Sequence, residues 1–207
     1  MTFQFLFFDT VDSAFGRVDR ESLPQQALME MVIQGITNKE DICCNVVEPK
    51  DVEEWIGVPI EDGEVVEIEW INYDLEGSVH LAWLPSSGRI FAAINNLLTG
   101  TVDWAFLPTS MEILDLALNA FTGSICLERL PEIMVYLNVS ENAFCGSLKL
   151  ESLPDTLTEF NACDNQFFAN PTKGHLSVVG WTSTPVLGEA KNLFKPLVVF
   201  LSWRRPY

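Results

Sequence analysis

The sequence has few of the residues on which catalytic and metal sites depend. It contains two histidines in 207 residues, and neither stands in an H-E-x-x-H pattern. A glycine-rich phosphate loop and a G-x-S-x-G motif are both missing. The five cysteines form no C-x-x-C pair, which argues against zinc, and their odd number argues against a disulfide framework. We therefore expect a protein without catalytic residues, cofactor or metal.

Long apolar runs are also missing. No stretch approaches the roughly 18 apolar residues that a membrane-spanning helix needs, so we expect no membrane span in this chain. The apolar segment 3–8 is too short for a secretory signal, and no basic residues precede it. These two absences favour a cytoplasmic location.

Basic residues are scarce. Twelve Lys and Arg stand against 29 Asp and Glu, which gives a formal net charge of -17. Such a surface repels phosphates, so we expect no nucleic-acid partner, and a basic protein or peptide fits better. The scarcity ends near residue 169, because residues 170–207 contain five bases and a single acid, Glu189. This shift predicts a boundary there.

What the sequence does contain is a repeat with a period of 23 residues. Leu-Pro pairs begin at Leu84, Leu107, Leu130 and Leu153. Asparagines follow the same spacing at Asn96, Asn119, Asn142 and Asn165. Glycines follow it at Gly77, Gly100, Gly123 and Gly146. Three independent marks in one register indicate a stack of similar structural units.

Each part of the repeat, L-x-x-L-x-L-x-x-N-x-L, has a physical role. Alternating Leu114 and Leu116 predict a short strand with two side chains directed inward. Asn119 follows where the chain turns, and its amide can satisfy buried backbone groups, so we expect the four asparagines to form a ladder. The proline after each Leu blocks a helix and turns the chain back. One unit cannot bury its own apolar face, but about three stacked units can.

These motifs resemble the leucine-rich-repeat family, in particular the 23-residue repeats of single-celled eukaryotes, and are similar to plant-type repeats. The resemblance implies an α/β-type repeat solenoid, a right-handed superhelix with short parallel strands on its concave face. The segment Trp55-Ile56-Gly57-Val58, followed by residues 63–68, also resembles the plant-type N-terminal cap. Glu53 and Ile60 stand where that cap carries cysteines, so the cap disulfide is missing. The resemblance thus speaks against an extracellular role and for the cytoplasm.

The chain divides into four predicted segments. Residues 1–20 form a loosely ordered leader, 21–60 an N-terminal cap with a helix, 61–168 about five leucine-rich repeats, and 169–207 a non-repeat C-terminal segment. Two interpretations of the last segment stay open. It is either a cap whose strand at 196–203 covers the last repeat, or sequence foreign to the repeat protein.

The candidate binding residues are those that the resemblance directs toward solvent on the concave face. They are Glu67, Glu69, Ile90, Ile113, Asp115, Tyr136, Asn138 and Glu159, with Glu141 and Asp164 beside them. Ile90, Ile113 and Tyr136 predict an apolar stripe, and the acids predict a rim around it. Such a surface suits a basic, partly apolar protein face or peptide. Alternatively, the stripe packs against the chain's own basic C-terminal segment.

The leading functional prediction is a non-catalytic protein–protein interaction module that binds on its concave face. Three alternatives remain: an extracellular or cell-surface recognition module, the repeat segment of a larger receptor or enzyme, and a fragment without a function of its own. Fold alone does not decide among them, because one fold carries many functions.

Overall fold

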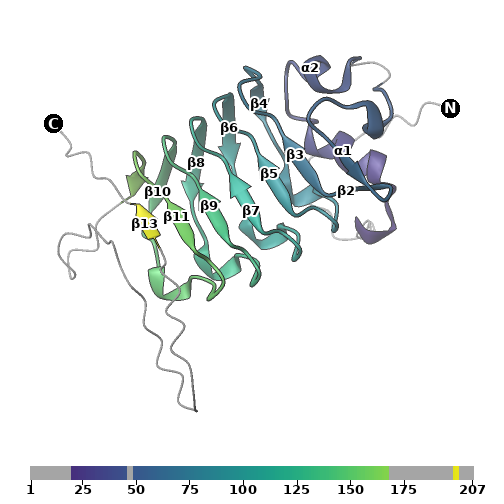
Figure 1. Cartoon of the computed structure of the whole chain (residues 1–207). Helices are drawn as coiled ribbons and strands as arrows, with labels where there is room; N and C mark the ends of the chain where they lie inside the picture. The colour runs from purple at the N-terminus through teal and green to yellow at the C-terminus, as the bar shows by residue number, and fades with distance from the viewer. Residues whose placement is uncertain (1–19, 46–48, 168–197, 201–207) are drawn as a thin grey trace, which may run out of the picture.

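The computed structural model describes residues 20–45, 49–167 and 198–200 (Figure 1). In this part of the chain, similar backbone turns stack side by side, and a small helical region lies at the N-terminal end of the stack. The predicted leader, except for its last residue Arg20, and most of the segment 169–207 lie outside the described residues.

One parallel sheet runs along the stack. Its strands are, in spatial order, β3 (Glu67–Glu69), β5 (Ile90–Ala92), β7 (Ile113–Asp115), β9 (Tyr136–Asn138), β11 (Glu159–Asn161) and β13 (Val198–Phe200). Between repeats the pairing joins equivalent positions, so that Ile113 lies beside Ile90 on one side and Tyr136 on the other. This is the sheet that the alternating apolar positions predicted.

The last strand of this sheet comes from the non-repeat segment. β13 pairs in parallel with β11, and Val198 lies beside Glu159 and Phe200 beside Asn161. A strand in this place satisfies backbone groups that the final repeat would otherwise leave at an open edge. The pairing agrees with the first of the two interpretations of the C-terminal segment, a strand that covers the last repeat.

A second parallel sheet was not expected from the sequence. It comprises β4 (Glu76–Ser78), β6 (Leu97–Thr101), β8 (Ala120–Ser124), β10 (Ala143–Gly146) and β12 (Gln166–Phe167). The Thr-Gly steps were interpreted only as tight bends. Gly100 and Gly123 do bend the chain, with φ of 90° and 87°, but they lie inside strands that pair across repeats. Positive φ at these sites favours glycine.

The four repeats that begin with β3, β5, β7 and β9 each end in a single 3₁₀ turn rather than an α-helix. These turns are η3 (Leu81–Trp83), η4 (Trp104–Phe106), η5 (Leu127–Arg129) and η6 (Leu150–Ser152). A Leu-Pro pair follows each of them, and the proline ring prevents a further helical turn. In the described residues, α-helix therefore occurs only before the first repeat.

The region before the repeats closes one end of the stack. It contains η1 (Arg20–Ser22), α1 (Gln25–Val32), α2 (Glu40–Cys43), η2 (Val52–Glu54), β1 (Ile60–Glu61) and β2 (Glu64–Val65). Met29 and Val32 of α1 are fully buried, and α1 packs against η3. The turn after α1 meets β4 closely, since Ser78 donates its backbone N–H to the carbonyl of Gly35 over 2.9 Å. Neither helix among the described residues is long and apolar enough to cross a membrane.

The core lies between the two sheets as stacked rows of equivalent side chains. Phe91, Leu114, Leu137 and Phe160 form one fully buried row. Aromatic contacts strengthen the neighbouring layers: Trp70 meets Phe91 edge-on with ring centroids 5.7 Å apart. Full burial of each such side chain stabilises the fold by about 1.5–3 kcal/mol relative to exposure. Each layer depends on the next, as the one-dimensional architecture requires.

Candidate binding surface

The residues proposed to bind a partner fall into two rows across the first sheet, which we call the strand face. The first row runs Glu67, Ile90, Ile113, Tyr136, Glu159, and neighbours in it are paired residues of adjacent strands. Equivalent atoms in such strands are about 4.8 Å apart, so the three central side chains form one continuous patch. The structure thus brings Ile90, Ile113 and Tyr136 together, with a carboxylate at each end of the row.

The second row is more polar. It runs Glu69, Ala92, Asp115, Asn138, Asn161 along the same strands. At one end, Glu67 and Glu69 lie near each other on β3. Partial burial, and then the negative charge of Glu69, raise the pKa of the Glu67 carboxyl above its usual value. Two acids held together in this way attract a cation that would relieve their repulsion.

Asp115 lies differently from the exposed acidic rim that the sequence suggested. It is only 7% exposed. Its carboxylate accepts hydrogen bonds from the Tyr136 hydroxyl at 3.2 Å and the Asn138 amide at 3.1 Å. The backbone N–H of Ala117 donates a third bond, at 3.0 Å. Asp115 therefore orients its neighbours within the strand face rather than presenting a charge to solvent.

This arrangement also changes the pKa of the Tyr136 hydroxyl. Burial, followed by the adjacent charge of Asp115, raises the pKa of the Tyr136 hydroxyl to about 12. The phenol stays neutral at ordinary pH and directs its O–H toward Asp115, while its ring stays in the apolar patch. The carboxylate and the ring thus act as one rigid unit at the middle of the strand face.

Glu141 and Asp164 lie away from the strand rows. Both follow the strands, at turn positions with φ of 51° and 53°. Glu141 is exposed and Asp164 is half-buried. They belong to the edge formed by the turns after the strands, which we call the turn edge, and not to the strand face.

The asparagine ladder holds the turns together from the inside. Asn119 donates its side-chain amide to the carbonyl of Ala93 at 2.7 Å, and its Oδ1 accepts the backbone N–H of Leu98 at 3.1 Å. Asn96, Asn142 and Asn165 make equivalent bonds to the repeats before them. These four side chains satisfy backbone groups between repeats, which is a structural role.

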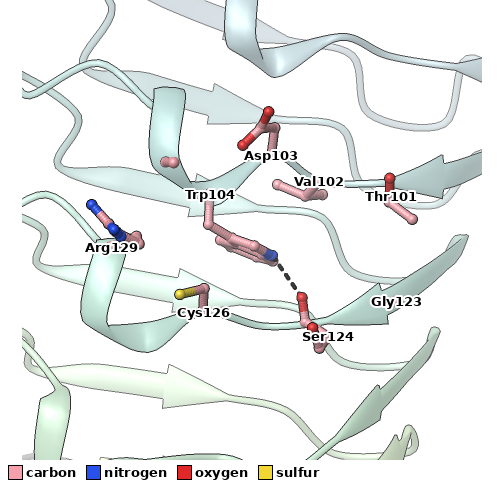
Figure 2. Close-up of a pocket in the computed structure, with 9 residues that line it drawn as sticks. Thr101, Val102, Asp103, Trp104, Gly123, Ser124, Cys126 and Arg129 are labelled. Carbon is pink, nitrogen blue, oxygen red and sulfur yellow. Dashed lines mark hydrogen bonds between the residues drawn. The ribbon is translucent and has the colours of Figure 1, made fainter.

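A hollow elsewhere on the repeats, shown in Figure 2, was not predicted from the sequence. Its volume is about 420 Å³, and it lies between β6 with η4 and β8 with η5. Trp104 forms its floor and donates its indole N–H to the carbonyl of Ser124 at 3.0 Å (Figure 2). Asp103, Cys126 and Arg129 stand around it. No group of three potential metal ligands gathers in the described part of the chain.

Comparisons with known proteins find similar solved structures but no similar protein family. No family model matches the chain, and neither does any curated protein. The BIR2 ectodomain of Arabidopsis thaliana superposes with a TM-score of 0.60 at 18% identity, covering 70% of this chain and 82% of that one. The leucine-rich-repeat ectodomain of the Arabidopsis receptor kinase HAESA, in complex with an IDA peptide hormone, gives 0.57 at 19%, covering 69% and 25%.

A third similar structure comes from another kind of protein. A plant ice-binding protein matches with a TM-score of 0.57 at 16% identity, covering 69% of this chain and 48% of that one. The similarity to receptor ectodomains and to an ice-binding protein at such identities reports a shared fold and not a shared function. Two sheets of short parallel strands, asparagine turns and these structural matches together establish the fold as a leucine-rich-repeat solenoid.

Proposed function

We propose that this chain is a non-catalytic recognition module that binds a protein or peptide through the strand face. The observation that carries this proposal is the row of Ile90, Ile113 and Tyr136, three half-buried side chains that lie side by side between Glu67 and Glu159. Apolar patches with a charged rim are typical of interaction sites. The acids favour a basic partner and would speed its approach.

The similar structures support the receptor-type form of this function over the cytoplasmic one. HAESA is bound to a peptide hormone, and another match is a complex of BIR3 with SERK2. Both are proteins in which the same architecture meets a peptide or a second protein. We therefore favour a recognition segment of the kind found in receptor ectodomains, over the free cytoplasmic binder that the missing cap cysteines suggested.

Selection from a random peptide library displayed on phage tests the proposal. The wild-type chain should enrich peptides rich in Lys or Arg with at least one large apolar residue. Ile113→Ser should abolish their binding, because it removes the centre of the patch without disturbing Asp115. Ile133→Ser is the matched control, since Ile133 is 44% exposed outside both rows of the strand face.

The proposal fails if wild type and Ile113→Ser enrich the same peptides with the same affinity. Equal binding of the peptides to Ile133→Ser and to wild type is the expected control result. The proposal also fails if peptides that pass this control carry no basic residue. Substitution of Asp115 would be a poor test, because its carboxylate organises Tyr136 and Asn138 from a buried position.

A further inference from the structure

A second apolar site lies on the turn edge, outside the strand face. Leu97 and Leu118 are 55% and 39% exposed, which is unusual for leucines in a repeat whose other leucines form the core. They line a hollow of about 310 Å³ together with Asn95, Asn96, Asn119, Ala120 and Glu141. We call this hollow the leucine notch. It is large enough to receive one apolar side chain.

The backbone at Leu118 shows that this leucine is not there for stability. Its φ is 57°, a left-handed conformation that costs a residue with a branched apolar side chain about 1 kcal/mol. The equivalent position holds Asn72, Asn95, Glu141 and Asp164 in the other repeats, all polar and all with positive φ. Asparagine adopts this conformation readily. A strained and exposed leucine at a site suited to Asn points to a role for its side chain in contact with another molecule.

The charges around the leucine notch define the occupant. Asp74 lies one repeat before Leu97, and Glu141 lies one repeat after Leu118; both are exposed. The turn edge comprises residues 72–74, 95–97, 118–120, 141–143 and 164–166, and these contain no Lys or Arg. An apolar side chain that enters the notch is therefore best flanked by cations, and a negatively charged or neutral segment would gain less.

The spacing of the repeats sets the spacing of those cations. Along the stack, Asp74 and Glu141 are three repeat steps apart, or roughly 14 Å at about 4.8 Å per step, with the leucine notch midway. Asp74 is the third residue of its turn and Glu141 the first of its own, so the two carboxylates are also offset across the turn edge. In an extended peptide, residues i, i+2 and i+4 face the same side and span roughly 14 Å. The separation of the two carboxylates along the stack thus matches the separation of residues i and i+4 in an extended peptide. A peptide with basic residues at i and i+4 and an apolar residue at i+2 would place the apolar side chain at the leucine notch.

We propose that the leucine notch binds an extended segment with the pattern basic–x–large apolar–x–basic, laid across the turns. This inference goes beyond the proposed function, because it places a second binding site outside the strand face and names the chemistry of its ligand. The apolar side chain packs between Leu97 and Leu118, and the two cations meet Asp74 and Glu141.

A synthetic peptide with Ser, Arg, Ser, Leu, Ser, Arg, Ser in order provides the probe. Fluorescence anisotropy of the labelled peptide should show saturable binding to the whole chain. Leu118→Asn should weaken that binding about tenfold or more, as expected for the loss of a buried leucine contact. The same variant should unfold at an equal or higher temperature than wild type, because Asn suits the left-handed backbone. Loss of binding with retained stability is the signature of a contact residue.

Three controls make the test decisive. A peptide with Leu replaced by Ser should not bind, and a peptide with Leu moved by one position should bind no better than that one. Glu141→Gln should weaken binding several-fold and reduce its salt dependence. Equal affinity of wild type and Leu118→Asn for the probe would overturn the leucine notch, as would failure of wild type to prefer the Leu peptide.

The outcome is separable from that of the proposed function. Ile113→Ser should leave binding of the seven-residue probe unchanged, since Ile113 lies in the strand face. If library-selected peptides depend on Ile113 while the probe binds wild type and Leu118→Asn equally, the strand face stands and the leucine notch falls. If neither substitution matters to any basic peptide, both proposals fall together.

Discussion

At the scale of single residues, the same amino-acid type does different work at different places. Asn119 lies inside the turn and bonds to backbone of two repeats, whereas Asn95 lies outside and donates to the side chain of Asn72. Asp115 is a buried acceptor, whereas Glu141 faces solvent. The residue type alone therefore does not tell whether a polar group supports the fold or the surface.

Removal of one rung of the ladder should be costly. In Asn119→Ala, the carbonyl of Ala93 and the N–H of Leu98 both lose their partner. Because buried unpaired groups cost about 1–3 kcal/mol each, the free energy of unfolding should fall by about 2–3 kcal/mol. Urea denaturation followed by circular dichroism measures this fall. Gln166→Ala, at an exposed site beside Asn165, is the control and should change it by less than about 0.5 kcal/mol.

Tyr136 should make the protein sensitive to alkaline pH. Its pKa is about 12 in the folded protein against an ordinary value near 10. Between these pH values the unfolded chain releases the Tyr136 proton and the folded chain keeps it, so stability falls as pH rises through this window. Tyr136→Phe should lose stability less steeply there. The comparison of urea midpoints at pH 9 and pH 11.5 measures it, and identical slopes in both proteins would contradict the raised pKa.

The sequence predicted part of the candidate site and missed the rest for physical reasons. The register of Ile90, Ile113 and Tyr136 followed from the 23-residue period, because parallel strands place equivalent positions side by side. The burial of Asp115 did not follow, since it depends on the hydrogen bonds that Tyr136 and Asn138 donate. Leu118 was missed because a positive φ at a leucine leaves no mark in the sequence.

At the scale of elements, the N-terminal region and the first repeat approach each other closely at Gly77. Gly77 has φ of 98°, and a Cβ at this position would lie 2.2 Å from the carbonyl oxygen of Gly35. Ile36 forms a bridge to Gly77, and Thr37 donates its N–H to the carbonyl of Glu76 at 2.9 Å. The turn after α1 is thus held against β4 by close backbone contacts, and the side chain of Asn38 adds a bond from the N–H of Glu76 at 2.9 Å.

Gly77→Ala should separate these elements. The substitution adds both backbone strain and a clash with a main-chain atom, so we expect a loss of about 3 kcal/mol. Gly100→Ala is the matched control: it has a similar φ of 90°, but its Cβ would meet only the Ser78 Cβ at 3.4 Å. It should cost about 1 kcal/mol. Equal losses in the two variants, measured by urea denaturation, would show that the contact with Gly35 is dispensable.

The elements also show where sequence patterns stop being informative. Strands of the first sheet were predicted because apolar residues alternate along them, as Leu114 and Leu116 do. The second sheet was not, because β6 and β8 carry a Thr-Gly step that is read more readily as a turn. Pairing with the next repeat, and not local preference, makes these segments strands.

At the scale of the whole molecule, the two ends of the array are covered in different ways. The N-terminal helices cover one end with buried side chains, while the other end is met by β13 through backbone pairing. In a one-dimensional stack, each end repeat has a single neighbour and depends on what covers it. We therefore propose that the C-terminal strand is a native part of this chain.

A chain that ends at Phe167 tests this proposal. Without β13, backbone amides of β11 should exchange with deuterium about tenfold faster, as expected for the loss of one or two hydrogen bonds. Val199→Pro in the full chain is the matched variant, because proline removes the N–H without shortening the protein. Both should accelerate exchange in β11 and leave β5 unchanged. Unchanged exchange in β11 of both proteins would favour sequence foreign to the repeats.

The asparagine ladder has a consequence for how such a gene can change in length. Each rung joins positions 21 or 26 residues apart, so its geometry holds only if the intervening segment keeps its length. Loss or gain of one or two codons inside the array puts the asparagine whose rung spans the change out of step with the carbonyl it serves. Duplication or deletion of 23 codons, in contrast, restores every rung. The array should therefore change in length by whole repeats of 23 residues, each of which is one complete turn of the coil.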